Sequence, residues 1–208
     1  MGAVGLWATP FYQGKLDNAQ ELKDAFLPFV TNDYMRKTFR LSECETSMKC
    51  PDNEQLPWDL FIQSVEPHIN TFFTDLDPKT PFDINFEDCW MNGYNENVFQ
   101  EVHDHSFRNV NWSTVYYLDL PEQENDVSGK TVFENRYGSD VKKNNFINVF
   151  NFFQNHERWI PEVETGSFIV FPCWVPHHTI PNSNPNQKRL TITANLSIHP
   201  KTGEVPNQ

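Results

Sequence analysis

The sequence predicts an α+β fold that is mainly β, with helices first and an antiparallel sandwich or barrel after them. Apolar residues recur at three- and four-residue intervals in the N-terminal part, which indicates helices. Beyond the segment "DPKTPFD" the apolar period changes to two, which indicates strands. Because 208 residues suit one domain with a proper core, we predict a single domain over 1–208, with a helical support region at 1–80 and a β core at 81–200.

Two helices are expected in the N-terminal region. The segment "NAQELKDAFLPFV" (18–30) begins with Asn18, a residue type that caps helices well, and its apolar residues share one face. The segment "PWDLFIQSVEPHINTFFTDL" (57–76) keeps helical apolar spacing along its length. Pro67 lies inside this segment and has no amide hydrogen, so we expect it to kink or split the second helix.

The strands follow as short runs separated by turn residues. "NVNWSTVYYLDLP" alternates with period two, "TGSFIVFP" follows a turn at Gly166, and "RLTITANLSI" is rich in β-branched residues. The segment 136–157 has no such pattern and is expected to be a long loop, of the kind that often forms a lid or binding loop. Further strands are expected near 84–92, 97–103, 130–135 and 158–163.

Composition excludes some classes of function. With 28 acidic and 16 basic residues the net charge is −12, and such a surface repels a phosphate backbone, so nucleic acid is a disfavoured partner. No apolar run approaches the ~18 residues of a membrane span. The N-terminal "MGAVGLWATPFYQGKL" lacks the features of a secretory signal, so we expect a cytoplasmic protein. The sequence leaves the oligomeric state open.

The four cysteines do not have the C-x-x-C spacing that is typical of redox and zinc sites. In a reducing compartment we expect them to be free thiols. Cys44 and Cys50, in "CETSMKC", leave open a disulfide bridge or half of a zinc site.

The stretch "QEVHDHSFRN" (100–109) holds a candidate metal site. Near the end of a strand, residues two apart point to the same face, so His103 and His105 can converge while Asp104 faces away. Imidazole pairs of this kind suit Zn, Fe, Cu or Ni. Asp104 would become a ligand only if a bulge rotated the strand, and it could instead orient a ligand histidine.

A second histidine pair and an arginine lie far along the chain. His177 and His178, in "FPCWVPHHTIPN", follow a buried strand, where one of them could reach the same metal; a solvated loop is the alternative. Arg189 opens an apolar alternating strand, and a buried guanidinium without an anion is costly. Its partner would be a protein carboxylate or a bound acid.

The order of these motifs resembles the Fe(II)/2-oxoglutarate-dependent oxygenases. The likeness is strongest to the 2-oxoglutarate oxygenases of bacteria and tailed phages, which are similar to prolyl hydroxylases. It covers nearly the whole chain, and its register selects His177 over His178. The segments that carry it are "LWATPFY", "WMNGY", "QEVHDH", "STVYYLDLP", "GSFIVFPCWVPHHTIPN" and "RLTITAN".

The resemblance implies a double-stranded β-helix (jelly roll) with the N-terminal helices packed on the major sheet, and 81–200 as its catalytic core. It implies Fe(II) and 2-oxoglutarate as cofactors. It also implies hydroxylation of a C–H bond by O2 in a small molecule or a protein residue, with succinate and CO2 as coproducts. The metal ligands would be His103, His105 and His177, and the residues that bind 2-oxoglutarate would be Asn92, Tyr94, Arg189, Thr191 and Asn195.

One position departs from this family pattern. Most of the superfamily has a carboxylate where this chain has His105, so three neutral imidazoles would leave the iron site one charge more positive and strengthen its hold on an anionic keto acid. Two other functions stay open: a cupin-like dioxygenase with three histidine ligands and no keto acid, and a non-catalytic jelly-roll binding module. Candidate pocket residues are Trp112, Tyr116, Tyr117, Arg136 and Trp174.

Overall fold

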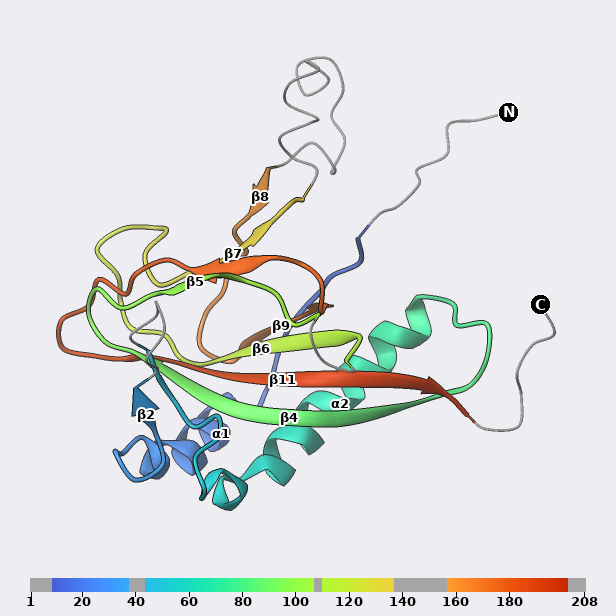
Figure 1. Cartoon of the computed structure of the whole chain (residues 1–208), viewed down its shortest axis with the longest axis horizontal. Coiled ribbons are helices and arrows are strands. Elements are labelled where there is room, and N and C mark those ends of the chain that lie inside the picture. Colours follow the sequence, from blue (N-terminus) through green and yellow to red (C-terminus); the bar gives the residue numbers. More distant parts are fainter. Residues whose placement is uncertain (1–8, 38–43, 107–109, 137–156, 202–208) are drawn as a thin grey trace, which may run out of the picture.

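The computed structural model describes residues 9–37, 44–106, 110–136 and 157–201. Within these residues the chain forms two antiparallel sheets that face each other, and two helices pack on the outer face of the larger sheet (Figure 1). The larger sheet has the order β1 (Tyr12–Lys15), β9 (Ser167–Pro172), β6 (Trp112–Asp119), β11 (Arg189–Pro200), β4 (Phe82–Tyr94), β3 (Glu45–Thr46) and β2 (Arg36–Lys37). The smaller sheet has the order β5 (Gln100–His103), β10 (His177–Thr179), β7 (Thr131–Glu134) and β8 (Arg158–Trp159).

Successive strands from β4 onward alternate between the two sheets. β4, β6, β9 and β11 belong to the larger sheet, β5, β7 and β10 to the smaller one, and β8 extends the smaller sheet beside β7. This alternation is the double-stranded β-helix that the resemblance implied, so the predicted fold class is confirmed. The candidate site lies in the interior between the two sheets, lined by the C-terminal part of β4, the N-terminal part of β11, β5 and β10.

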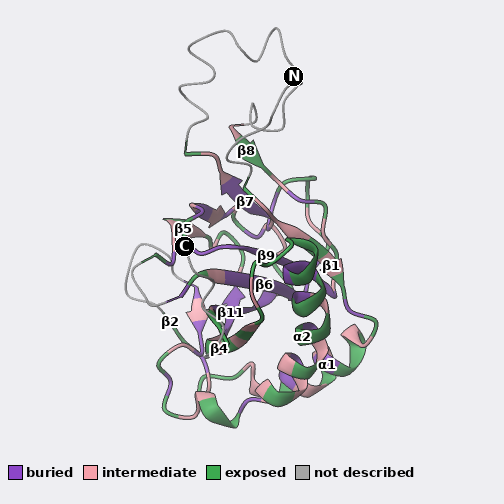
Figure 2. Cartoon of the chain, turned by 90° about the vertical axis from the view of Figure 1, so that its right-hand side faces the viewer, coloured by how far each residue is buried: buried purple, intermediate pink, exposed green. Residues whose placement is uncertain are grey.

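Period-two alternation sorts each strand of the larger sheet between two cores. In β6, Tyr116 and Leu118 belong to the core beneath the helices, whereas Val115 and Tyr117 face the smaller sheet. All four residues are buried, and Figure 2 shows β6 largely in the purple of buried residues. The two hydrophobic cores cover both faces of this strand. Because the side-chain period of a strand is two, the apolar pattern in the sequence correctly identified these strands.

The two helices are α1 (Ala19–Phe26), followed by the 3-10 turn η1 (Leu27–Phe29), and α2 (Trp58–Asp75), preceded by the 3-10 turn η2 (Asn53–Gln55). Pro67 lies inside α2, yet α2 is one continuous helix. Of the two expected effects, the split was therefore wrong, and the kink stays a prediction. Residues on both sides of Pro67, including Val65 and Ile69, are fully buried against the larger sheet. This packing on both sides outweighs the single hydrogen bond that proline removes.

The N-terminal 80 residues also contain strands, which the sequence analysis missed. β1 pairs with β9 over four residues, and β2 and β3 extend the other edge of the larger sheet. β2 and β3 have two residues each, too short for a period to show. β10 was expected to be a loop exit but is a strand of three residues. The predicted lid at 136–157 lies almost entirely outside the described residues.

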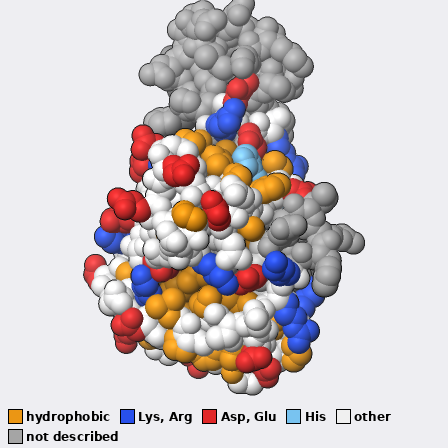
Figure 3. All heavy atoms as spheres, turned by 90° about the vertical axis from the view of Figure 1, so that its left-hand side faces the viewer, with side chains coloured by type: hydrophobic (Ala, Val, Ile, Leu, Met, Phe, Trp, Pro, Cys, Tyr) orange, Lys and Arg blue, Asp and Glu red, His pale blue; other side chains and the backbone are white. Residues whose placement is uncertain are grey.

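Two simpler expectations concern cysteines and the membrane. None of the four cysteines, all of which lie within the described residues, forms a disulfide bridge, so the bridge between Cys44 and Cys50 that the sequence left open is not made. Among the described residues, no helix combines the length and the apolar character that crossing a bilayer requires. Figure 3, which views one side of the molecule, shows acidic and basic side chains interspersed around hydrophobic ones, so the excess negative charge is not concentrated on that face.

Candidate metal and cofactor site

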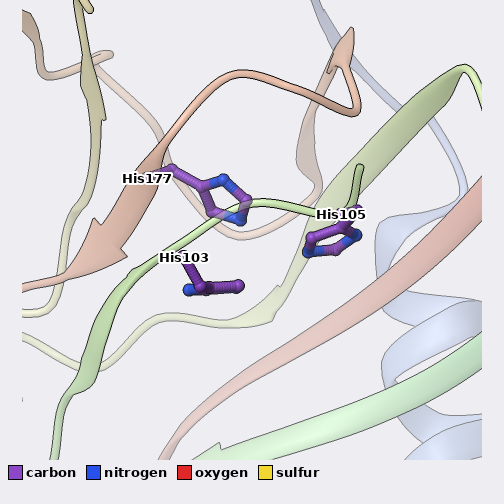
Figure 4. Close-up of side chains that lie close together, drawn as sticks. All are labelled: His103, His105 and His177. Atoms are coloured by element: carbon purple, nitrogen blue, oxygen red, sulfur yellow. The ribbon is translucent and has the colours of Figure 1, made fainter. Parts of the chain in front are cut away.

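Three histidines converge between the two sheets. His103 is the last residue of β5, and it lies directly opposite His177, the first residue of β10. His105 follows two residues after His103, and its ring turns to the same side (Figure 4). The ring centroids are 4.3 Å apart for His103 and His177, 5.2 Å for His105 and His177, and 5.4 Å for His103 and His105. One ring nitrogen from each histidine lies within 4.8 Å of the others.

Backbone carbonyls fix the tautomer of two of these rings. His103 Nδ1 lies 2.7 Å from the carbonyl oxygen of Glu101, and His177 Nδ1 lies 3.0 Å from that of Val175. A carbonyl oxygen only accepts, so each Nδ1 carries the hydrogen and donates it. The Nε2 atom of each ring therefore keeps its lone pair, which is the form that binds a metal ion.

His105 is oriented by side chains instead. Its Nδ1 lies 2.6 Å from Oδ1 of Asn195 and 3.1 Å from Oγ of Ser113. Ser113 in turn donates to Asn195 Oδ1 at 3.2 Å, and the ring of Trp90 packs 5.8 Å from the His105 ring. His105 is 5% exposed and Asn195 is 1% exposed. The buried side chains of Asn195 and Ser113 thus hold the His105 imidazole in the same tautomer as the other two.

Burial keeps two of the imidazoles neutral. Desolvation lowers the pKa of His103, and it lowers the pKa of His177 well below the ordinary value, with the neighbouring histidines adding to the effect on His177. A neutral ring is required for metal binding, because a protonated imidazole has no free lone pair.

Asp104 points away from the three rings. Its carboxylate accepts hydrogen bonds from Ser106, and its Oδ2 lies 2.6 Å from Nη2 of Arg136. These contacts, led by the Ser106 hydroxyl, hold the pKa of Asp104 below its ordinary value. His178 likewise turns outward, with Nδ1 3.5 Å from Glu134 Oε1. The structure thus brings together His105 and His177, and leaves Asp104 and His178 outside the cluster.

Arg189 is buried next to the histidines, with 1% of its surface exposed. Its Nη2 donates to Thr131 Oγ1 at 3.0 Å, and its guanidinium carbon lies 4.7 Å from the ring centre of Tyr94 and 5.5 Å from that of Tyr117. Nε and Nη1 have no hydrogen-bond acceptor among the described residues. Burying two such nitrogens of a cation is costly, and the arrangement therefore favours an anionic ligand at this position.

A cavity of about 30 Å³ connects Arg189 with the histidines. It is lined by all three histidines and by three further predicted residues, Asn92, Tyr94 and Thr191. β4 and β11 pair Tyr94 with Arg189 and Asn92 with Thr191, which brings the two distant motifs side by side. Asn195 was expected to bind the cofactor, but it does not line the cavity and instead holds His105. Asn195 lies two residues beyond Thr193 on β11, on the same face of the strand, where it contacts the His105 ring.

The candidate pocket residues fall into different places. Tyr116 and Trp112 pack in the core beneath the helices, so they do not reach the cavity. Tyr117 lies beside Arg189, Arg136 pairs with Asp104, and Trp174 is 43% exposed. Sequence reasoning missed four polar residues that line the cavity, Gln100, Thr131, Thr179 and Thr193. Two of them carried a sequence signal: Gln100 stands three residues before His103 in the histidine motif, and Thr193 shares the strand face of Thr191.

The residues present fit both cofactors of the resembled family. The three imidazoles form a donor set that suits Fe(II), and their ring nitrogens lie within 4.8 Å of one another, close enough to converge on one ion. The two unpartnered nitrogens of Arg189 suit a carboxylate, which accepts two parallel hydrogen bonds from a guanidinium. The cavity joins the two groups, as a ligand that touches both would require.

Comparison with known proteins gives a family and a fold. The family model described as "Putative 2OG-Fe(II) oxygenase" matches residues 88–195, just over half of the chain. A comparison with curated proteins gave no match. Solved structures match over most of the chain at low identity, and these likenesses concern the fold.

Three solved structures illustrate that fold. A Pseudomonas putida prolyl-4-hydroxylase is 15% identical, with a TM-score of 0.60, over 92% of this chain and 94% of its own. A Trichoplax adhaerens prolyl hydroxylase, in complex with a peptide fragment of hypoxia inducible factor, is 10% identical with a TM-score of 0.62, over 91% and 84%. HygX from Streptomyces hygroscopicus, with nickel and 2-oxoglutarate bound, is 8% identical with a TM-score of 0.57, over 93% and 84%.

Proposed function

From the premise that this chain belongs to the 2OG-Fe(II) oxygenase family, we propose that it hydroxylates an unactivated C–H bond with the residues described above. The chain is an Fe(II)/2-oxoglutarate-dependent dioxygenase, and its cofactors are Fe(II) and 2-oxoglutarate. In the proposed assignment, His103, His105 and His177 bind the iron, and Arg189 binds the distal carboxylate of the keto acid. Asn92, Tyr94 and Thr191 complete the keto-acid pocket.

The observation that carries this assignment is the buried Arg189, with two guanidinium nitrogens that have no partner among the described residues, beside three histidines. A metal site without a keto acid would explain the histidines alone. A binding module would have no need for a guanidinium that lacks an acceptor. Only a ligand with an anionic end and a metal-binding end uses both features, and 2-oxoglutarate is such a ligand.

The bound iron and keto acid supply the oxidising chemistry, in which O2, 2-oxoglutarate and the substrate C–H yield succinate, CO2 and the alcohol. The chain's own residues position the reactants and exclude water. The Nδ1 hydrogen bonds of the histidines hold their rings with Nε2 directed inward. Arg189 and Thr191 hold one end of the keto acid. The apolar ring of Phe171 stands 4.9 Å from the His177 ring and keeps that side of the site dry.

Three histidine ligands change the charge of the site. Without a carboxylate ligand, the bound dication keeps one more positive charge than in a site with two histidines and one carboxylate. The dication and Arg189 together carry three positive charges against the two negative charges of the keto acid, so one positive charge remains in the loaded site. We infer tight keto-acid binding from this excess of positive charge.

The substrate is proposed to be a protein residue or a small molecule. The two prolyl hydroxylases share the fold over most of both chains, so a prolyl residue in an extended peptide is the first class to test. The neighbour from Trichoplax adhaerens binds a peptide fragment, which supports including peptides of that form in the test.

The test measures O2 consumption and succinate formation by the iron-loaded protein, with and without 2-oxoglutarate. We expect both to depend on 2-oxoglutarate and to yield one succinate per O2. O2 consumption that is independent of the keto acid would instead support a three-histidine dioxygenase of another type. The Arg189→Met variant is expected to lose keto-acid turnover while it still binds the metal.

A further inference from the structure

Gln100 connects the metal-binding and keto-acid parts of the site. Its Oε1 accepts a hydrogen bond of 2.8 Å from the Tyr94 hydroxyl. Because Oε1 is thereby fixed as the acceptor, the other end of the amide is a donor, and its Nε2 lies 3.3 Å from Nε2 of His103. In this arrangement the amide occupies the lone pair with which His103 would bind a metal ion.

A β-bulge directs the Gln100 side chain inward. Residues three apart on a regular strand point to opposite faces, so Gln100 and His103 would be separated by a regular β5. The register of the pairing between β5 and β10 shifts here, because His177 pairs with His103 while Thr179 pairs with Gln100. Three residues of β5 therefore span the same length as two residues of β10. The additional residue in β5 turns the side chains of both Gln100 and His103 into the cavity. Bulges are frequent next to active sites, where they re-aim a side chain.

The cavity requires a lining side chain to move before the keto acid can enter. A volume of about 30 Å³ holds a water molecule or two, whereas 2-oxoglutarate is several times larger. Arg189, Tyr94 and His177 are buried and packed, at 1%, 2% and 8% exposure. Gln100 is only partly buried and has three rotatable side-chain bonds, so it is the lining residue that can most easily change conformation.

We propose that Gln100 is a positioning residue whose side-chain N–H changes its hydrogen-bond partner, from His103 to the keto acid, when the metal ion and the keto acid bind. Once the Nε2 lone pair of His103 is given to a metal ion, it can no longer accept the hydrogen bond from Gln100. The released N–H then donates to a carboxylate oxygen of the keto acid, while Tyr94 continues to hold Oε1. Gln100 therefore competes with a metal ion for the His103 lone pair, and it supports keto-acid binding once the ion is bound. This inference rests on the proposed function.

The test compares wild type with Gln100→Met, which keeps the length of the side chain but removes its donor and acceptor. Mn(II) is titrated into each metal-free protein, and 2-oxoglutarate is then titrated into each Mn(II)-loaded protein by calorimetry. We expect the Mn(II) affinity of Gln100→Met to equal that of wild type or to exceed it by up to about five-fold. Its affinity for 2-oxoglutarate should be about five- to ten-fold lower than that of wild type. Gln13→Met is the matched control, because Gln13 is exposed on β1, and it should match wild type in both titrations.

Each outcome separates this inference from the proposed function. If Gln100→Met binds 2-oxoglutarate as tightly as wild type, or loses Mn(II) and 2-oxoglutarate affinity in parallel, the exchange role is refuted while the proposed function stands. If wild type itself binds neither Mn(II) nor 2-oxoglutarate, both fail. Far-ultraviolet circular dichroism and a thermal melt show that the variant is folded, which removes misfolding as a cause of weaker binding.

Discussion

We predict that Arg189, which is needed to bind the keto acid, destabilises the metal-free protein. Replacing it with methionine should therefore not lower the free energy of unfolding. Its two unpartnered nitrogens cost about 2–6 kcal/mol together, at about 1–3 kcal/mol for each buried group. The hydrogen bond to Thr131 and the contact with the Tyr94 ring return about 2–5 kcal/mol. A buried methionine adds about 1–3 kcal/mol of apolar burial.

Together these contributions give a change in the free energy of unfolding between about −2 and +7 kcal/mol for Arg189→Met, centred near +2.5 kcal/mol. For a chain of this size, the central value corresponds to a rise in melting temperature of about 5–10 °C. An ordinary truncation of a fully buried side chain instead lowers stability by about 2–5 kcal/mol. A rise in stability thus indicates a guanidinium held for a ligand, whereas a loss of more than about 2 kcal/mol indicates one held for packing.

The assay is thermal unfolding of metal-free protein, repeated with Mn(II) and then with Mn(II) and 2-oxoglutarate. Wild type should gain stability in both steps, by about 2.7 kcal/mol in the second step when the keto acid is 100-fold above its dissociation constant. Arg189→Met should keep the first gain and lose the second. Arg36→Met, at an exposed position on β2, is the control and should behave as wild type. A variant destabilised by more than about 2 kcal/mol, or one that still responds to 2-oxoglutarate, would refute the reasoning.

Three further predictions concern the histidines. His105→Ala should lose stoichiometric metal binding in a Mn(II) titration, whereas Asp104→Ala should match wild type because Asp104 faces Arg136; the reverse pattern would make Asp104 the ligand. Asn195→Leu should weaken metal binding about ten-fold in the same titration by freeing the His105 ring, and unchanged affinity would contradict its orienting role. Since burial lowers the pKa of His177 and His103 in the folded protein, the unfolded chain binds more protons below pH ~6.5. The free energy of unfolding of the metal-free protein, measured with denaturant, should therefore fall as the pH is lowered from about 7 to about 5, and a pH-independent value would contradict this.

Much of the fold could be predicted because period-two alternation is a direct consequence of strand geometry. β6 and β9 are covered on both faces by apolar side chains, so their patterns were visible in the sequence. β2, β3 and β10 could not be predicted, since two or three residues show no period and their strand form depends on neighbours distant in the chain. Pro67 was misjudged because tertiary packing, which local rules omit, keeps α2 continuous.

The candidate site was predicted more fully than its surroundings. Because residues two apart on a strand point to the same face, His103 and His105 were expected on one side. The distant His177 and Arg189 were selected by the order of motifs that resembles the family. The same parity argument would have turned Gln100 outward, and only the bulge in β5 reverses that result. A bulge depends on how two strands align, so it is not encoded in the pattern of one strand. The orienting role of Asn195 likewise depends on the pairing of β11 with β6.

The most direct measurement is an anaerobic titration of the Fe(II)-loaded protein with 2-oxoglutarate, followed by visible absorption. Chelation of the iron by the keto acid should produce a weak charge-transfer band that saturates at one equivalent. His177→Ala should give no band because the metal is lost, and Arg189→Met should need far more keto acid to reach it. A wild-type protein that binds iron but gives no band at any concentration of 2-oxoglutarate would contradict the account.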